Sequence, residues 1–223
     1  MGGLDPPAGT RAERLTGRVS YHRKSEENGV ASNAEMKAAF DRLASAWTNS
    51  EKDDAVREEI TGMIGPRRNS VIADIGCGKG VMLGHLLKTH PSRIYAVDIS
   101  GEMIRCAREL HRDMRITFVN DDILNASLPL LDAAVIFNAY PHLTDKRALT
   151  EKLSGVVRRG GCVVIAHSHG RKKINGVHER KRMEAISVPL RPAQVEAMEF
   201  APQFAPDIMV DREDIFLLRM IRR

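Results

Sequence analysis

Residues 71–80, with the sequence Val-Ile-Ala-Asp-Ile-Gly-Cys-Gly-Lys-Gly, constrain the fold of this chain more than any other stretch. A short apolar run, which predicts a buried strand, leads directly into glycines at positions 76, 78 and 80. Residues 81–88 then carry apolar side chains at helical spacing. Glycines permit positive φ and close approach of a ligand to the backbone, and a helix N-terminus offers free N–H groups. This succession of strand, glycine turn and helix is typical of a site for a nucleotide-like ligand.

Composition limits the classes of protein to which the chain can belong. No apolar run approaches the roughly 20 residues of a membrane span, and the N-terminus lacks the apolar core of a signal peptide, so we expect a cytoplasmic protein without membrane contact. Cys77, Cys106 and Cys162 form no close pair, which indicates reduced thiols. The net charge of +5 is spread along the chain and only 4% of residues are aromatic, which argues against nucleic acid as a partner.

The periodicity divides the chain into an arm and one domain. Residues 1–32 are rich in Gly, Pro, Arg, Ser and Glu without a sustained apolar period, which predicts a flexible N-terminal arm. Residues 33–223 are predicted to form a single domain. Within it, residues 33–66 form an N-terminal helical cover of two helices, and residues 171–200 form a second helical cover after the fifth strand.

Strands and helices alternate through the middle of the domain. The predicted strands of this part cover residues 71–75, 93–97, 116–119, 131–137 and 162–166. The predicted helices cover residues 101–111, 146–157, 171–187 and 192–200, and a turn is expected at residues 158–161. Two further strands, 207–210 and 215–221, flank a polar turn. The predicted fold class is α/β, a Rossmann-like, mostly parallel sheet with helices on both faces and a C-terminal antiparallel hairpin at the edge.

The glycine spacing and two later acids narrow the choice of ligand. A dinucleotide fingerprint would place its third glycine at position 81, which is Val81 here, so an NAD-dependent oxidoreductase is disfavoured. Asp98 ends the second strand, where an acid can accept from the two hydroxyls of a ribose. Asp122 ends the third strand, where a carboxylate can accept from an adenine amino group.

Together these residues resemble the class I S-adenosylmethionine-dependent methyltransferases, in a small bacterial-type form with one domain. Residues 74–80 resemble the first motif of the family, residues 96–100 with Met103 and Ile104 the second, and residues 120–123 the third. Residues 153–165 resemble the helix, turn and strand that follow the fourth motif. Residues 40–47 resemble the helix that many small-molecule members place over the methyl donor.

The resemblance implies S-adenosylmethionine as cofactor and a set of donor contacts. Backbone from Gly76 to Gly78 would hold the methionine part, Asp98 the ribose, and Asp122 with Ile123 the adenine. The complete expected donor set is Asp74, Gly76, Cys77, Gly78, Asp98, Ile99, Met103, Asp122, Ile123 and Asn138. Alternatively, the three acids are turn residues at strand ends and Met103 is a core residue.

The acceptor side is predicted beyond the carboxyl ends of the fourth and fifth strands. The expected substrate-binding residues are Trp47, His142, His167, His169, Arg171, Asn175 and His178. Three interpretations of the histidines stay open. They are solvated loop and helix residues, or they orient the acceptor with His142 or His167 as the catalytic base, or three of His142, His167, His169 and His178 bind a divalent metal.

The predicted function is methyl transfer to a small-molecule acceptor by in-line displacement. The Asn-Pro-Pro-Tyr motif of methyltransferases that act on nucleic-acid bases is absent, and residues 138–141 carry similar letters in another order. Basic residues between positions 172 and 182 are either solvated charges or attract an anionic acceptor. The alternatives are an RNA-modifying methyltransferase and a module that binds the donor without catalysis. The sequence predicts no oligomeric state.

Overall fold

The computed structural model describes residues 31–46, 54–65, 68–180 and 183–223. Trp47 and all but the last two residues of the predicted N-terminal arm lie outside the described residues.

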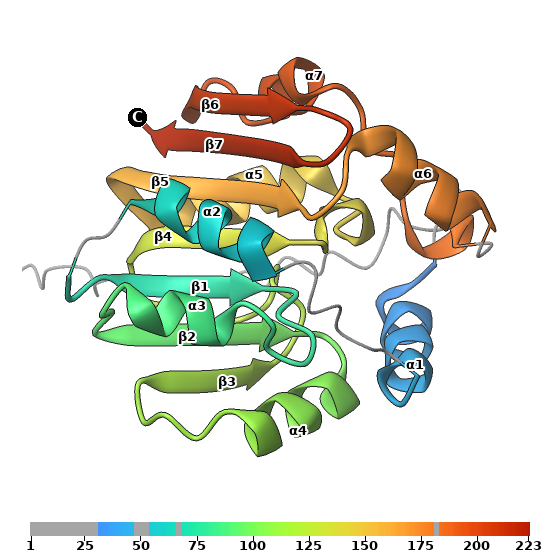
Figure 1. The fold of residues 1–223 in the computed structure, drawn as a ribbon, viewed down its shortest axis with the longest axis horizontal. Helices are drawn as coiled ribbons and strands as arrows, with labels where there is room; N and C mark the ends of the chain where they lie inside the picture. Colours follow the sequence, from blue (N-terminus) through green and yellow to red (C-terminus); the bar gives the residue numbers. More distant parts are fainter. Residues whose placement is uncertain (1–30, 47–53, 66–67, 181–182) are drawn as a thin grey trace, which may run out of the picture.

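Seven strands form one sheet in the order β3-β2-β1-β4-β5-β7-β6 (Figure 1). The strands are β1 (Val71–Ile75), β2 (Arg93–Asp98), β3 (Ile116–Asn120), β4 (Leu131–Phe137), β5 (Val157–His167), β6 (Phe204–Asp211) and β7 (Phe216–Arg222). The first five strands in that order pair in parallel, whereas β7 pairs antiparallel with both β5 and β6. The predicted parallel sheet with a C-terminal antiparallel hairpin is therefore confirmed.

Helices cover both faces of this sheet. They are α1 (Asn33–Ala44), α2 (Asp54–Ile64), α3 (Leu83–Lys88), α4 (Gly101–Leu110), α5 (Lys146–Val156), α6 (Arg171–Arg180) and α7 (Ala193–Glu199), with short 3-10 helices η2 (Tyr140–His142) and η3 (Glu184–Ile186). Apolar side chains of α2, α3 and α4 pack in one core cluster, and those of α5 and α7 pack in the other. Within the described ranges, no helix is long and apolar enough to cross a membrane.

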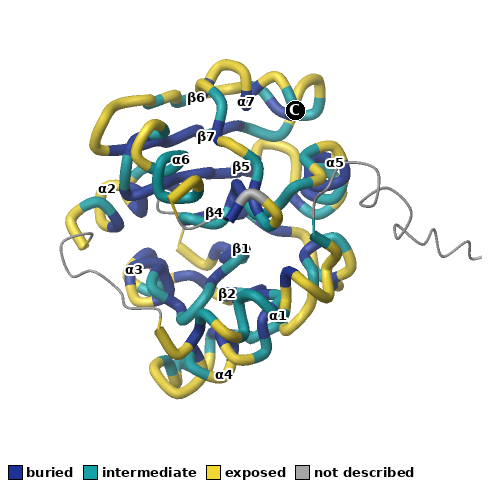
Figure 2. The backbone as a smooth tube through the Cα atoms, turned by 90° about the vertical axis from the view of Figure 1, so that its right-hand side faces the viewer, coloured by how far each residue is buried: buried dark blue, intermediate teal, exposed yellow. Residues whose placement is uncertain are grey.

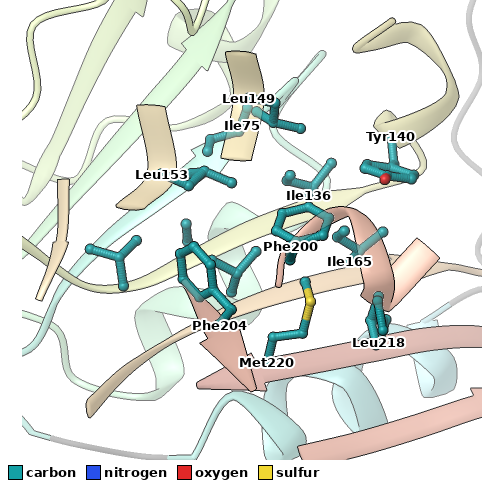
Figure 3. Packing of buried hydrophobic residues seen from close by; sticks show 14 of the residues in the cluster. Ile75, Ile136, Tyr140, Leu149, Leu153, Ile165, Phe200, Phe204, Leu218 and Met220 are labelled. Atoms are coloured by element: carbon teal, nitrogen blue, oxygen red, sulfur yellow. The ribbon is translucent and has the colours of Figure 1, made fainter. Parts of the chain in front are cut away.

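The core behind β4 and β5 supports the end of the sheet where the functional residues gather. Tyr140, Phe200 and Phe204 are fully buried there, together with Ile136 and Ile165 from the two strands (Figure 3). Burial of large apolar side chains of this kind contributes roughly 1.5–3 kcal/mol each. The residues that follow β4 are therefore supported by a cluster of buried apolar side chains.

Two predicted boundaries are wrong. Residues 158–161, expected as a turn, lie within β5. The strand continues through them because its pairing register with β4 shifts there: Leu131 pairs with Val157, but Ala133 pairs with Cys162. Gly160, with a φ of +74°, allows this local departure from a regular strand. The helix expected from position 171 to beyond 180 ends at Arg180, and η3 follows in place of its last turns.

The helix α1 lies at the side of the sheet where the parallel strands end (Figures 1 and 2). Ser32 caps this helix and forms a capping box with Glu35. Asp41 fixes the helix against α4, because its Oδ1 accepts from Ser100 Oγ at 2.6 Å and from the Glu102 N–H at 3.2 Å. Hydrogen bonds from Lys37 and Ser100 lower the pKa of Asp41 to about 2, so this carboxylate is charged at neutral pH.

Candidate functional site

The glycine turn between β1 and α3 forms the first wall of the site. Gly76, Gly78 and Gly80 have φ values of +67°, +53° and +83°, the left-handed region that favours glycine. A Cβ on Gly76 would lie 2.5 Å from the Cβ of Ala139, so the turn is packed closely against the end of β4. A Cβ on Gly78 would meet no atom within 4 Å. Among the three, Gly78 is therefore the one with room beside it for a ligand.

Asp98, at the end of β2, holds this turn in place. Its Oδ2 accepts from the Gly78 N–H at 2.8 Å, and its Oδ1 accepts from the Ser100 N–H at 2.9 Å. Burial raises the pKa of this carboxyl group, which is only 8% exposed. Each carboxylate oxygen has a further lone pair, so Asp98 can still accept from a ligand hydroxyl.

Asp74, at the carboxyl end of β1, carries an unsatisfied acceptor inside the site. The residue is 1% exposed, and its Oδ2 has no hydrogen-bond partner among the described residues. Burial, reinforced by the charge of Asp98, raises the pKa of Asp74 to about 7. A buried carboxyl group without a partner beside an open glycine turn fits a ligand that brings a cation, such as the ammonium of a methionine moiety.

The remaining predicted donor contacts come after β2 and β3 or from α4. Asp122 follows β3, and its Oδ1 accepts from the Leu124 N–H at 3.0 Å while its Oδ2 accepts from the side-chain amide of Asn33 at 2.6 Å. Ile123 and Met103 are buried, whereas Ile99 is half-buried. The geometry thus leaves Ile99 more accessible to an adenine ring than Met103.

Cys77 contributes its backbone to the turn. Its N–H donates to the Val97 carbonyl at 3.1 Å. Burial and the nearby Asp74 raise the pKa of the thiol well above its usual value, so the side chain stays protonated and unreactive.

Asn138 joins the ends of β4 and β5. Its side-chain oxygen accepts from the Ser168 N–H at 3.0 Å and its amide donates to Ser168 Oγ at 3.2 Å. The residue adopts a φ of +53°, which is uncommon outside glycine and places it in the sharp turn after the strand. This hydrogen-bonded pair sets the spacing between the loops that carry His142 and His167.

His142, in η2, has one ring nitrogen engaged and the other free to act as a base. Its Nδ1 lies 2.8 Å from the Ile186 carbonyl oxygen, which can only accept, so Nδ1 carries the proton and Nε2 carries the lone pair. The ring centres of Phe40 and His178 each lie 5.0 Å from the ring centre of His142, and the Phe40 and His142 rings meet edge to face. Burial lowers the pKa of His142 to about 4, so the side chain is neutral at physiological pH.

His167 ends β5 and is 1% exposed. Its Nε2 has no hydrogen-bond partner within the described ranges, and its ring packs edge-on against Phe216 at 6.1 Å. Burial, with smaller effects of His142, His178 and Lys146, lowers the pKa of His167 to about 3. The structure therefore brings His142, His167 and His178 to one region, as the sequence predicts.

The other predicted acceptor residues are engaged elsewhere. Both ends of the Asn175 amide bind the Leu190 backbone, at 3.0 and 2.9 Å, so this residue anchors α6 to the following segment. Arg171 donates from Nε to Asp211 at 3.1 Å. His169 lies 3.4 Å from the Lys173 amine near the surface. The roles predicted for Arg171, Asn175 and His169 in acceptor binding stay predictions, and the structure shows which protein groups these side chains contact.

The histidines do not form a metal site. In the part of the chain that the structure describes, no group of three His, Cys, Asp or Glu side chains could hold a metal ion. The metal interpretation of His142, His167, His169 and His178 therefore finds no geometric support.

Lys146 is a residue beside the histidines that sequence reasoning missed. Its Nζ donates to the Tyr140 carbonyl at 2.5 Å and lies 3.4 Å above the Tyr140 ring. Burial lowers the pKa of Lys146 to about 7. The Tyr140 hydroxyl in turn donates to buried Glu196, which is paired with Arg191. In the sequence, Lys146 is only the first residue of a predicted helix, and nothing there indicates that its side chain would be buried against Tyr140.

Part of the chain is similar to known proteins. Residues 72–161 match the model of a family described as "Methyltransferase domain". An uncharacterized methyltransferase of Mycobacterium tuberculosis is 31% identical over 121 residues, 53% of this chain and 59% of the relative. The 2-methyl-6-phytyl-1,4-hydroquinone methyltransferase of a Synechocystis strain is 31% identical over 100 residues, 44% of this chain and 31% of that relative. The chain thus spans less than two thirds of these relatives.

The fold has close structural counterparts as well. The N-methyltransferase NodS from Bradyrhizobium japonicum, solved in complex with S-adenosyl-L-homocysteine, superposes with a TM-score of 0.63 at 17% identity. The match covers 84% of this chain and 98% of NodS. At this identity the similarity shows a shared fold.

Proposed function

We propose that the chain is a class I, S-adenosylmethionine-dependent methyltransferase that transfers a methyl group from S-adenosylmethionine to a small-molecule acceptor. The match of residues 72–161 to a methyltransferase model and the similarity to named methyltransferases support this proposal. The observation that carries this proposal is the pairing of the open glycine turn at Gly78 with Asp98, which holds that turn from the next strand at 2.8 Å. An acid in this place can read the ribose hydroxyls of a nucleoside.

The donor would be held by residues from three strand ends. The backbone near Gly78 and the carboxyl group of Asp74 would bind the methionine part, Asp98 the ribose, and Asp122 the adenine amino group. S-adenosylmethionine supplies a methyl group on a sulfonium, which is an already good leaving group. The task of the chain is therefore to position the acceptor in line with that methyl and to exclude water.

We propose His142 as the base that accepts the proton of the acceptor. The Ile186 carbonyl fixes its tautomer, so Nε2 presents a lone pair. When the acceptor forms its new bond to the methyl carbon and the carbon–sulfur bond breaks, the acceptor proton passes to this nitrogen. His167, with its buried and unpartnered Nε2, would orient the acceptor from the neighbouring strand end.

We expect the acceptor to be a small molecule with a hydroxyl or amino group. The Synechocystis relative is named for a hydroquinone substrate, which supports an acceptor of this size. The exposed Lys172 and Lys173 on α6 favour an acceptor with negative charge.

Calorimetry with S-adenosylhomocysteine and NAD in parallel tests the proposed donor. We expect saturable heat with S-adenosylhomocysteine alone. Saturable binding of NAD without any binding of S-adenosylhomocysteine would overturn the proposal. Transfer of a labelled methyl group to a panel of small hydroxylated and amino compounds, with bulk RNA alongside, then tests the acceptor class.

Donor binding should release a proton from Asp74. With a pKa of about 7, this buried group is mostly protonated at pH 6 in the free chain, and an arriving cation favours its ionised form. Calorimetry at pH 6 in buffers of different ionisation enthalpy should show roughly one proton released, and Asp74→Asn should abolish the buffer dependence. Equal buffer dependence in both proteins would contradict this assignment.

Replacing His142 by Asn should slow methyl transfer by about a hundredfold, the lower end of the range for a lost general base. The Kd for S-adenosylhomocysteine should change less than about twofold, because His142 is assigned to the acceptor. His90→Asn is the matched control at an exposed histidine outside the proposed site. Because the pKa of His142 is about 4, its base form predominates above pH 5, and the rate of the unaltered enzyme should not lose this base until the pH falls toward 4. A rate unchanged by His142→Asn would exclude His142 as the base.

A further inference from the structure

Asn33 contacts Asp122, a residue of the proposed donor site, from a helix that lies outside the sheet. From the first turn of α1, its side-chain amide donates to Oδ2 of Asp122 at 2.6 Å, across 89 positions of sequence. The other oxygen of the same carboxylate accepts from the Leu124 N–H at 3.0 Å. Both oxygens of Asp122 are therefore engaged by the chain itself.

The group that Asn33 presents is chemically equivalent to the group expected from the donor. A primary amide and the 6-amino group of adenine are both planar NH₂ donors. Resting on the donor proposed above, we propose that in the free chain the Asn33 amide lies where the adenine amino group would approach Oδ2 of Asp122, so that the two NH₂ groups compete for this side of the carboxylate. Asn33 thereby determines how tightly the chain binds an adenine nucleoside.

The local structure allows this exchange without unfolding α1. Asn33 is exposed, so its side chain can rotate toward solvent. The helix cap is formed by Ser32, whose hydroxyl and backbone N–H both contact the Glu35 carboxylate, at 2.7 and 2.8 Å. Asp41 holds the same helix against Ser100. Loss of the Asn33 contact therefore leaves both the cap and the docking of α1 in place.

The competition reduces donor affinity by the net free energy of one solvent-exposed hydrogen bond. A ligand that competes with an intramolecular partner binds more weakly, because only the molecules in which the partner has left the site can bind it. The apparent Kd is the intrinsic Kd divided by the fraction of such molecules. Removal of the Asn33 amide should therefore tighten binding of an adenine-containing ligand roughly three- to tenfold. A ligand without the amino group gains nothing, because it does not take the place of Asn33.

The test measures the Kd of two ligands by calorimetry on three proteins. The ligands are S-adenosylhomocysteine and its analogue with unsubstituted purine in place of adenine. The proteins are the unaltered chain, Asn33→Ala, and Arg42→Ala as a control on the same helix. Thermal unfolding confirms that each variant is folded. We expect Asn33→Ala alone to tighten S-adenosylhomocysteine binding, with the purine analogue changed by less than about twofold.

The outcomes separate this inference from the proposed function. Weaker or unchanged binding of S-adenosylhomocysteine to Asn33→Ala, or equal tightening of both ligands, overturns the role of Asn33 while the donor assignment stands. Absence of S-adenosylhomocysteine binding to the unaltered chain overturns both.

Discussion

Replacing Asp98 by asparagine is expected to weaken binding of S-adenosylhomocysteine by about a hundredfold or more. The carboxylate receives the N–H groups of Gly78 and Ser100 and is assigned to the ribose hydroxyls. Asparagine keeps the shape but turns one acceptor oxygen into a donor, which would then face a backbone N–H. The ribose hydroxyls would lose two hydrogen bonds to a charged carboxylate. Each such bond contributes about 1.5 kcal/mol or more, and the two together correspond to a roughly hundredfold weaker Kd.

Calorimetry measures this effect, and Asp113→Asn provides a matched control. Asp113 pairs with Arg115 at 2.8 Å just before β3, so it is a strongly paired acid at the opposite end of the strands. Its replacement should leave the Kd within about twofold. A Kd for Asp98→Asn within threefold of the unaltered protein would exclude Asp98 from the donor site.

Replacing Gly76 by alanine is expected to lower the free energy of unfolding by about 2–5 kcal/mol. Left-handed backbone strain in a residue other than glycine contributes roughly 1–2 kcal/mol. The new methyl group would also lie 2.5 Å from the Cβ of Ala139, and relief of such an overlap contributes about 1–3 kcal/mol more. Because the turn packs directly on the end of β4, any backbone shift also displaces the Gly78 N–H.

Urea unfolding of two alanine variants in parallel separates the two effects. Gly160→Ala, with a φ of +74° and nothing within 4 Å of the added Cβ, carries the strain without the overlap. It lies at the opposite end of β5, so its donor affinity should stay unchanged. Equal destabilisation by Gly76→Ala and Gly160→Ala would show that the contact with Ala139 does not matter.

The order of strands and helices could be predicted because local patterns specify it. Apolar runs such as 131–137 predict buried strands, and the polar turn before β7 predicts the hairpin. The extent of β5 could not be predicted, since Arg158, Gly160 and Gly161 suggest a turn. Only pairing with β4 shows that the strand continues through them with an irregular register.

The sequence predicts which residues come together on the proposed donor side better than it does on the proposed acceptor side. Asp74, Gly76, Gly78 and Asp98 lie within one continuous stretch or at the end of the next strand, so spacing alone brings them together. The partner of Asn33 is 89 positions away, and the amide of Asn175 is used by Leu190. Such polar contacts depend on how helices are docked, which no periodicity encodes.

The helix α6 buries none of its side chains and stays in place through a few polar contacts, among them those of Asn175 and Arg171. The described residues between β5 and α7 contribute no strand to the sheet. Substitutions of exposed residues on α6 should therefore leave the core of the sheet intact, whereas Leu190, later in the same segment, belongs to that core. The surface of α6 can therefore vary at little cost in stability, whereas the glycine turn, with its positive φ values and its contact with Ala139, tolerates little change.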